Sequence, residues 1–260
     1  MPFTPSHAVV ALPFVRTPLL PAAIAIGAMT PDLPLFLRGT PLSYQATHTN
    51  LLLSGVIALV LLALWYLLLR PAVRELSPDA LARRLPGEWD AGPRATWRQI
   101  ARGRPAWVSA LWIVVSLLLG VVTHIVWDAF THEGRWGVRL VPALDEQWGP
   151  LVGYKWLQHG SSILALVIIA AYGAWWLARR RPAASVTRAL PGWMRVAWWV
   201  SLPVVLVAAW GSGLAAYGPL TPSWTAQHLA YRVLPPACAV WGAITLALCL
   251  VVVARRRGRR

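Results

Sequence analysis

The feature that most constrains this chain is a set of five apolar stretches, each close to the length that crosses a lipid bilayer. They lie at about residues 49–69, 107–129, 160–178, 193–217 and 236–254. A helix of about 20 apolar residues spans the hydrocarbon core of a membrane. Hydrophobic residues make up 57% of the chain and charged residues only 13%, a balance that a soluble domain does not need. The sequence therefore predicts an all-α fold, a multi-pass transmembrane helical bundle with about five full spans.

A sixth apolar region, residues 8–37, is interrupted by Arg16 and by several prolines. Proline inside a helix removes a hydrogen bond and clashes with the preceding turn, and irregular backbone at membrane depth has to be buried in protein. We expect a re-entrant or short-helix region here rather than another clean crossing. No Lys or Arg precedes Arg16 and no small-residue cleavage site is evident, so we do not expect a removable signal peptide.

The basic residues are unevenly distributed along the chain, whose formal net charge is +15. Of the 24 Lys and Arg residues, 18 lie in segments 70–104, 179–195 and 255–260, which fall on one side of a five-span bundle. An excess of Lys and Arg in cytoplasmic loops sets the orientation of membrane proteins. We therefore expect the Arg-rich loops and the C-terminus to be cytoplasmic. This placement explains the charge without nucleic acid, so we expect membrane lipids as partners and no nucleic acid.

The chain is predicted to have two parts. Residues 1–178 form a membrane domain that carries the candidate site and includes a cytoplasmic Arg-rich loop at 70–106. Residues 179–260 add two further transmembrane helices and a basic C-terminal tail. With the Arg-rich loops inside, residues 30–48, 130–159 and 218–235 face outward.

Three ionisable residues, His124, Asp128 and His132, lie four residues apart at the end of an otherwise apolar stretch. At this spacing the three side chains share one face of a helix. Ionisable groups inside a membrane segment are costly and normally mark a functional site. Two imidazoles and a carboxylate form a plausible half-site for a divalent metal. A buried hydrogen bond between His124 and Asp128 is the simpler alternative.

Three further candidate residues lie on the same predicted outer side, and a fourth joins them under one condition. Asp32, in the sequence Thr-Pro-Asp-Leu-Pro, is either a ligand or the cap of a short helix. His48 stands at a predicted helix start, where Thr47 or Asn50 supplies the cap and leaves the imidazole free. His159 opens a predicted membrane helix in the sequence Gln-His-Gly-Ser-Ser. His7 joins them only if the N-terminal region enters and returns on the same side, as a Pro-broken hairpin would.

These motifs resemble those of the bacterial membrane family that carries domain of unknown function 4184. The resemblance covers roughly residues 2–178 and rests on an ordered series: Thr-Pro-Ser-His7, Pro-Asp32, Thr-His48, Gly-x-x-x-His124-x-x-x-Asp128, Thr-His132 and Gln-His159-Gly-Ser-Ser. The series is also similar to the YdjM-like inner-membrane proteins, which are described as metal-dependent hydrolases. This resemblance implies a location in the bacterial inner membrane. A more distant likeness is to zinc-dependent phospholipase C and the S1/P1 nucleases.

The resemblance implies a set of metal ligands: His7, Asp32, His48, His124, Asp128, His132 and His159. It also implies that Asp32 or Asp128 bridges two ions or orients the attacking water, as the catalytic residues. The soluble phospholipases place a Glu four residues after their last His, whereas this chain has Ile163. We therefore expect one or two divalent ions, with zinc as the expected metal, rather than three.

The expected function is that of a membrane-embedded, metal-dependent hydrolase acting at the outer face. Its expected substrate is a phosphoester in a lipid-linked or amphiphilic molecule. The alternative is a non-catalytic integral membrane protein in which the same residues form a structural metal site or a hydrogen-bonded polar cluster. Transport is disfavoured because the inner halves of the predicted spans are almost wholly apolar.

Overall fold

The computed structural model describes residues 3–257, and these residues are mostly helical. Within them, five helices are long and apolar enough to cross a membrane, each with 26 to 31 residues. Their bounds are Leu51–Leu76, Ala106–Thr131, Gly153–Ala178, Gly192–Tyr217 and Ala226–Arg256. This confirms the predicted multi-pass helical fold.

The helices extend beyond the apolar stretches from which they were predicted. The first span joins α4 (Leu51–Leu64), a π-helical turn (Trp65–Leu69) and α5 (Arg70–Leu76), and so includes charged residues. The others are α8 (Ala106–Thr131), α10 (Gly153–Ala178), α11 (Gly192–Tyr217) and α12 (Ala226–Arg257). Apolar composition marks the part of a helix that suits the hydrocarbon core, whereas helical hydrogen bonding continues past it.

The chain divides into two compact units. The first contains the residues up to 33, residues 42–63 and residues 97–180, and the second contains residues 34–41, 64–96 and the residues from 181 onward. All the candidate site residues belong to the first unit. The boundary predicted at residue 178 divides the part that carries the candidate site from the last two spans. It does not describe compact units, and it stays a prediction.

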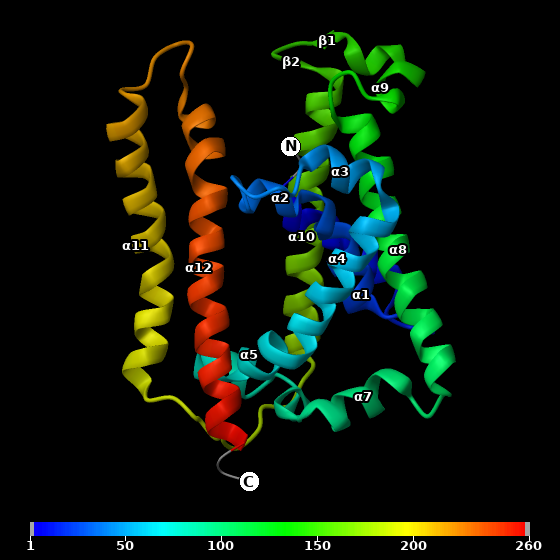
Figure 1. Cartoon of the computed structure of the whole chain (residues 1–260), viewed down its shortest axis with the longest axis vertical. Coiled ribbons are helices and arrows are strands. Elements are labelled where there is room, and N and C mark those ends of the chain that lie inside the picture. Colours follow the sequence, from blue (N-terminus) through cyan, green and yellow to red (C-terminus); the bar gives the residue numbers. More distant parts are fainter. Residues whose placement is uncertain (1–2, 258–260) are drawn as a thin grey trace. The chain divides into compact units, whose positions relative to one another are not determined.

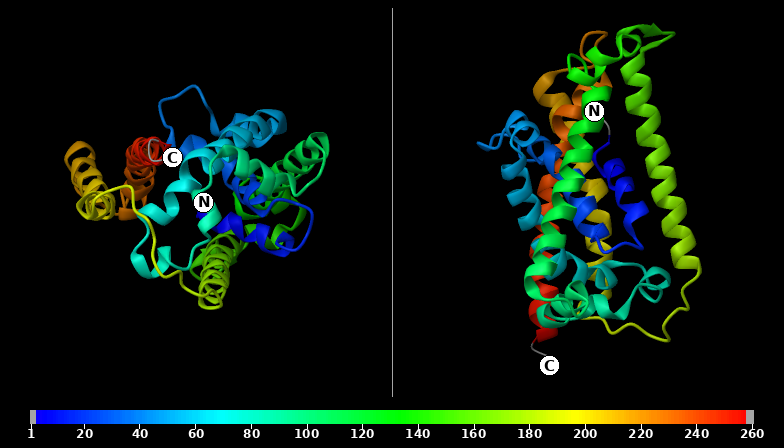
Figure 2. Two further views of the ribbon diagram at one scale, coloured as in Figure 1. Left: turned by 90° about the horizontal axis from the view of Figure 1, so that it is seen from below. Right: turned by 90° about the vertical axis from the view of Figure 1, so that its right-hand side faces the viewer.

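The N-terminal region of the first unit consists of short helices broken by prolines, as predicted. It contains a 3-10 helix η1 (Thr4–Phe14), α1 (Pro21–Met29), a 3-10 turn η2 (Thr30–Asp32) and the start of α2 (Leu33–Phe36). Proline lies in the first positions of η1, α1 and η2, where its missing N–H costs no helical hydrogen bond. Figure 2 shows this segment, in dark blue, between α8 and α10.

Two glycines allow α1 to lie directly against α8. A Cβ atom at Gly27 would stand 2.2 Å from the carbonyl oxygen of Leu117, and one at Gly120 would stand 2.2 Å from that of Ile24. Small residues permit such close backbone approach between membrane helices. The hydroxyl of Ser116 also accepts a hydrogen bond from the backbone N–H of Leu20, at 3.0 Å. This contact fixes the end of α1, and therefore η2, beside the second half of α8.

The connection between α8 and α10 forms a small cap on the first unit. It contains α9 (Trp136–Leu140), the 3-10 turn η5 (Pro142–Asp145) and a two-stranded antiparallel hairpin, β1 (Gln147–Trp148) and β2 (Leu151–Val152). Gln147 pairs with Val152, and Trp148 pairs with Leu151. Val138, Leu144 and Tyr154 form the buried core of this cap.

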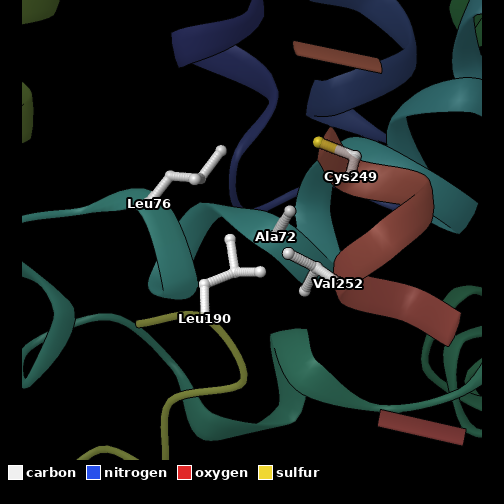
Figure 3. Close-up of a cluster of buried hydrophobic side chains, with 5 residues drawn as sticks. All are labelled: Ala72, Leu76, Leu190, Cys249 and Val252. Carbon is white, nitrogen blue, oxygen red and sulfur yellow. The ribbon is translucent and has the colours of Figure 1, made fainter. Parts of the chain in front are cut away.

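In the second unit, α11 and α12 run side by side (Figure 1). At one end of this pair, residues of α5 and α12 pack with Leu190 around a small apolar cluster, whose residues are Ala72, Leu76, Leu190, Cys249 and Val252 (Figure 3). The remaining short elements are α6 (Asp79–Ala82) and the 3-10 turn η4 (Gly87–Asp90), followed by α7 (Pro93–Ala101), which begins in this unit.

A buried carboxylate ties these segments together. Glu75 is fully buried and accepts hydrogen bonds from the backbone N–H groups of Ala189 and Leu190, at 2.8 and 3.0 Å. Arg256 pairs with Glu75 at 3.3 Å and with Asp90 at 2.8 Å. At least one arginine of the basic tail is therefore engaged within the protein.

Candidate metal centre

The centre is built on α8, which presents His124 and Asp128 from one buried face. Their spacing of four residues places the side chains one turn apart, and Nε2 of His124 lies 3.4 Å from Oδ2 of Asp128. His124 is fully buried and Asp128 is 3% exposed. The same face carries Ser116 and Gly120, the residues at which α1 makes its close contact.

Asp32 and His48 reach this pair from two other elements. Asp32 ends η2, directly after the contact of α1 with α8, and its Oδ1 lies 3.8 Å from Nε2 of His124. The short helix α3 (Tyr44–Thr49) is tied to η2 because the Thr47 hydroxyl donates a hydrogen bond to the carbonyl oxygen of Pro31, at 2.7 Å. The next residue, His48, places Nε2 at 3.6 Å from Oδ2 of Asp128.

Four side chains therefore converge: Asp32, His48, His124 and Asp128. One ligand atom from each lies within 4.8 Å of the others, and all four residues are buried. Imidazole nitrogen and carboxylate oxygen are common ligands of zinc and of related divalent ions. The cluster has the composition and spacing to hold one metal ion.

The hydrogen-bonding state of these atoms tests that interpretation. Within residues 3–257, buried atoms without a hydrogen-bond partner include Nε2 of His48 and of His124 and one carboxylate oxygen each of Asp32 and Asp128. Nε2 of His7 belongs to the same group. Burying a polar atom without a hydrogen-bond partner costs free energy. Five such atoms face one another here, and a bound cation would stabilise this arrangement. The residues thus fit a metal.

The opposite sides of the same ligands are held by the protein. Nδ1 of His124 lies 2.7 Å from the carbonyl oxygen of Ala28, and Nδ1 of His48 lies 2.8 Å from that of Tyr44. Metal-binding histidines usually donate their second ring N–H to a carbonyl or carboxylate, which orients the ring and leaves the other nitrogen free. The Thr4 hydroxyl donates to Oδ2 of Asp32 at 2.7 Å, and the Tyr44 hydroxyl donates to Oδ2 of Asp128 at 3.2 Å.

His7 and His132 border the group of four. Nε2 of His7 lies 3.7 Å from Oδ1 of Asp128, and its ring stacks on His124 with 4.0 Å between centroids. Burial, with the neighbouring His124, lowers the pKa of His7 to about 3, so its imidazole is neutral. Nδ1 of His132 lies 3.6 Å from Oδ2 of Asp128 but 3.1 Å from the backbone oxygen of the same residue. Nε2 of His132 faces the side-chain amide of Gln158 at 3.3 Å, so protein groups occupy both its nitrogens.

The structure does not bring His159 into this group. The helix α10 begins at Gly153, six residues before His159, rather than at the Gln-His-Gly-Ser-Ser sequence. The buried face of α10 carries Tyr154, Gln158 and Ser162. His159 follows Gln158, lies to one side of that face and is partly exposed. Ile163, which replaces the phospholipase Glu, is 65% exposed.

The structure decides between the helix caps and the alternatives that the sequence left open. Asp32 directly precedes α2 but does not cap it, because one carboxylate oxygen accepts from Thr4 and the other has no hydrogen-bond partner. His48 lies at the end of α3, whose cap is Ser43, while Asn50 caps the following helix by accepting from the N–H of Leu53. Of the two caps that the sequence offered, the structure confirms Asn50, while the Thr47 hydroxyl bonds to the carbonyl oxygen of Pro31.

Thr4, Tyr44 and Gln158 are the contacts that sequence reasoning missed. Tyr44 lies four residues before His48, and Gln158 directly precedes His159, so each is close in sequence to a recognised residue. Neither a hydroxyl nor an amide stands out in a polar segment. Only the folded arrangement shows that these groups face the ligands.

The fold and the site define a class: a multi-pass membrane protein with a buried cluster of Asp and His side chains able to hold a metal ion. More specifically, the chain belongs to the family described as Domain of unknown function (DUF4184), whose profile matches residues 1–256. The family match therefore includes the last two spans, which the resemblance read from the sequence left out. No curated protein and no solved structure matches the chain.

Proposed function

We propose that this protein is a membrane-embedded metal-dependent hydrolase that cleaves a phosphoester in a lipid or other amphiphilic molecule. The observation that carries the proposal is the set of five buried, unpartnered side-chain atoms that face one another around Asp128. The likeness to YdjM-like proteins and to zinc-dependent phospholipases, read from the motif series, supports hydrolysis as the activity. Zinc is the metal that this likeness favours.

A bound divalent ion would supply Lewis acidity, which polarises a phosphoryl oxygen and makes a water acidic enough to attack at neutral pH. The chain's own groups would then position the reactants. Asp32 and Asp128 each have a carboxylate oxygen without a hydrogen-bond partner, and either can accept the proton of the attacking water. Hydrolysis forms a bond from the water oxygen to phosphorus, breaks the ester P–O bond and delivers the proton to the leaving alcohol.

The proposed active site faces the outside of the cell membrane. The support for this orientation is the count of basic residues in the sequence: 18 lie in the Arg-rich segments, against five in the segments predicted to face outward. His124 and Asp128 lie in the last two turns of α8, near the end of the helix opposite the Arg-rich segment. A phosphate head group at the membrane boundary would reach this depth.

The first test is metal content, measured by mass spectrometry on detergent-purified protein. We expect stoichiometric metal in the wild type and its loss in His124→Ala and Asp128→Ala, each checked for folding by its size-exclusion profile. Protein that binds metal is then assayed against phosphomonoester and phosphodiester lipids. A folded wild type without metal, even after divalent ions are added, would contradict the metal centre, and no hydrolysis of any of these lipids would contradict the activity.

A structural metal site is the second candidate. Its specific support is the number of converging residues, because four ligands already complete a closed tetrahedral shell. Cobalt substitution distinguishes the two functions, since the visible spectrum of Co²⁺ reports its coordination. A spectrum that changes on addition of phosphate indicates an open position and favours the hydrolase, and a spectrum that does not change favours the structural site.

A further inference from the structure

A cavity of about 470 Å³ lies beside the metal centre in the first unit. Its walls come from η1, α8 and α10, and they are mostly apolar, with Val9, Val10, Trp127, Leu164, Ala165 and Ile168 among the lining residues. Pockets that bind small molecules commonly have volumes of roughly 300–1,000 Å³ and are mainly apolar with a few polar groups. The cavity therefore has the size and the lining of a ligand site.

The polar lining of the cavity comes from Ser6 and His7 on η1, with Thr123 on α8 and Ser161 on α10. His7 is only 8% exposed, and its Nε2 has no hydrogen-bond partner within residues 3–257. The same atom lies 3.7 Å from Oδ1 of Asp128. The cavity thus leads to the edge of the candidate metal centre, and His7 stands between the two.

Part of the lining is exposed on the outer surface of the helices and forms the rim of the cavity. Leu164 is 61% exposed, Ile168 is 41% exposed and Trp127 is 38% exposed, and all three belong to helices that suit a membrane span. Ser161 and Ile168 stand eight and fifteen residues after the start of α10, which is about 12 and 22 Å along the helix. The rim therefore lies at the depth of lipid hydrocarbon, so an apolar ligand can enter from the bilayer without crossing water.

We propose that this cavity binds one hydrocarbon chain of a lipid phosphoester and directs its phosphate past His7 toward the metal centre. The inference rests on the proposed function, because the metal centre is what identifies the polar end of the ligand as a phosphoester. A chain in the cavity lies against Val10, Leu164 and Ile168, and the small side chain of Ala165 leaves it room. The substrate class is then a membrane lipid rather than a water-soluble phosphoester.

The test uses full-length protein in phosphatidylcholine vesicles that contain a phosphatidic acid with a photoreactive diazirine in its acyl chain. After irradiation, peptide mass spectrometry locates the attached lipid. We expect label on the η1 segment that contains Val9 and Val10, which are only partly exposed. In Ala165→Leu this label falls by about tenfold, because the larger side chain occupies the space of the acyl chain. The matched control is Ala170→Leu on the exposed surface of the same helix, which keeps the label.

Metal content is measured in the same samples and stays at the wild-type level in both variants, which shows that the centre beside the cavity is intact. Label spread evenly over the lipid-facing helices, or label on η1 that Ala165→Leu does not reduce, overturns the inference even if the protein hydrolyses phosphoesters. Label that depends on Ala165 in a protein that hydrolyses none of these lipids keeps the chain site and removes the proposed hydrolase activity.

Discussion

Asp128 meets four imidazoles: the nearest nitrogens of His7, His48, His124 and His132 lie 3.4 to 3.7 Å from its carboxylate oxygens. Two of these histidines lie four residues away on either side, so their proximity follows from the helical repeat. The other two come from η1 and α3, and no local pattern predicts that they arrive. At the residue scale, the sequence predicts that His124 and His132 lie near Asp128. The approach of His7 and His48 depends on the tertiary fold.

The histidines inside and outside the cluster give the first prediction. His48→Ala removes a buried nitrogen that faces Asp128, so we expect loss of bound metal, whereas His159→Ala leaves all four converging residues in place and keeps it. Metal-to-protein ratios after dialysis against a weak chelator measure the difference. Equal loss in the two variants would mean that α10 contributes a ligand after all.

Hydrogen bonds to the ligands give a second prediction. Thr4→Val removes the donor to Asp32 while keeping the side-chain shape, and loss of such a supporting contact typically weakens metal binding by about 10- to 100-fold. Thr49→Val is the control, because the Thr49 side chain is exposed and bonds only to a carbonyl oxygen of its own helix. Competition with a chelator of known affinity gives the two dissociation constants. Identical constants would show that the Thr4 hydroxyl does not support the centre.

At the scale of elements, the contact between α1 and α8 sets the geometry of the centre. Gly120→Ala places a Cβ where the backbone of Ile24 and Ala28 now lies, and such overpacking costs about 1–3 kcal/mol. Because Ala28 holds the ring of His124 and Asp32 follows α1, we expect weaker metal binding together with a lower melting temperature.

Gly173→Ala on α10 is the control for this prediction, since a Cβ there meets nothing within 4 Å. Its expected effect is a gain of up to about 1 kcal/mol from helix propensity, with metal affinity unchanged. Thermal unfolding in detergent and metal titration measure both quantities. A Gly120→Ala protein that matches this control in both would show that the close approach of α1 is not needed.

The second unit depends in a similar way on Glu75. Glu75→Ala leaves the N–H groups of Ala189 and Leu190 without their acceptor and removes one partner of Arg256, so we expect a loss of about 3 kcal/mol in stability. Glu88→Ala, at an exposed position, is expected to change stability by less than about 0.5 kcal/mol. The midpoints of thermal unfolding compare the two, and equal midpoints would contradict a structural role for the buried carboxylate.

On the scale of the whole molecule, the sequence predicts the spans well because about 20 apolar residues have few other uses in a protein. It predicts the Pro-broken N-terminal region for a related reason, since proline excludes a continuous helix there. The sequence does not predict the path of that region. Its position depends on contacts between segments that are distant in sequence: the close approach at Gly27 and Gly120, and the hydrogen bond from Thr47 to Pro31. Four of the seven predicted ligands converge because of these long-range contacts, which no spacing rule contains.

The orientation of the molecule in the membrane yields the last prediction. Five spans with the Arg-rich segments inside place the hairpin of β1 and β2 outside, and segment 181–188 inside with the C-terminal end of α12. Single cysteines at Glu146 and at Arg181, both exposed, test this in a variant in which Cys238 and Cys249 are replaced by Ser. A membrane-impermeant maleimide added to intact cells labels Glu146→Cys at once and Arg181→Cys only after the membrane is opened. The reverse pattern would place the candidate metal centre on the cytoplasmic side, and the proposed substrate would then be a lipid of the inner leaflet.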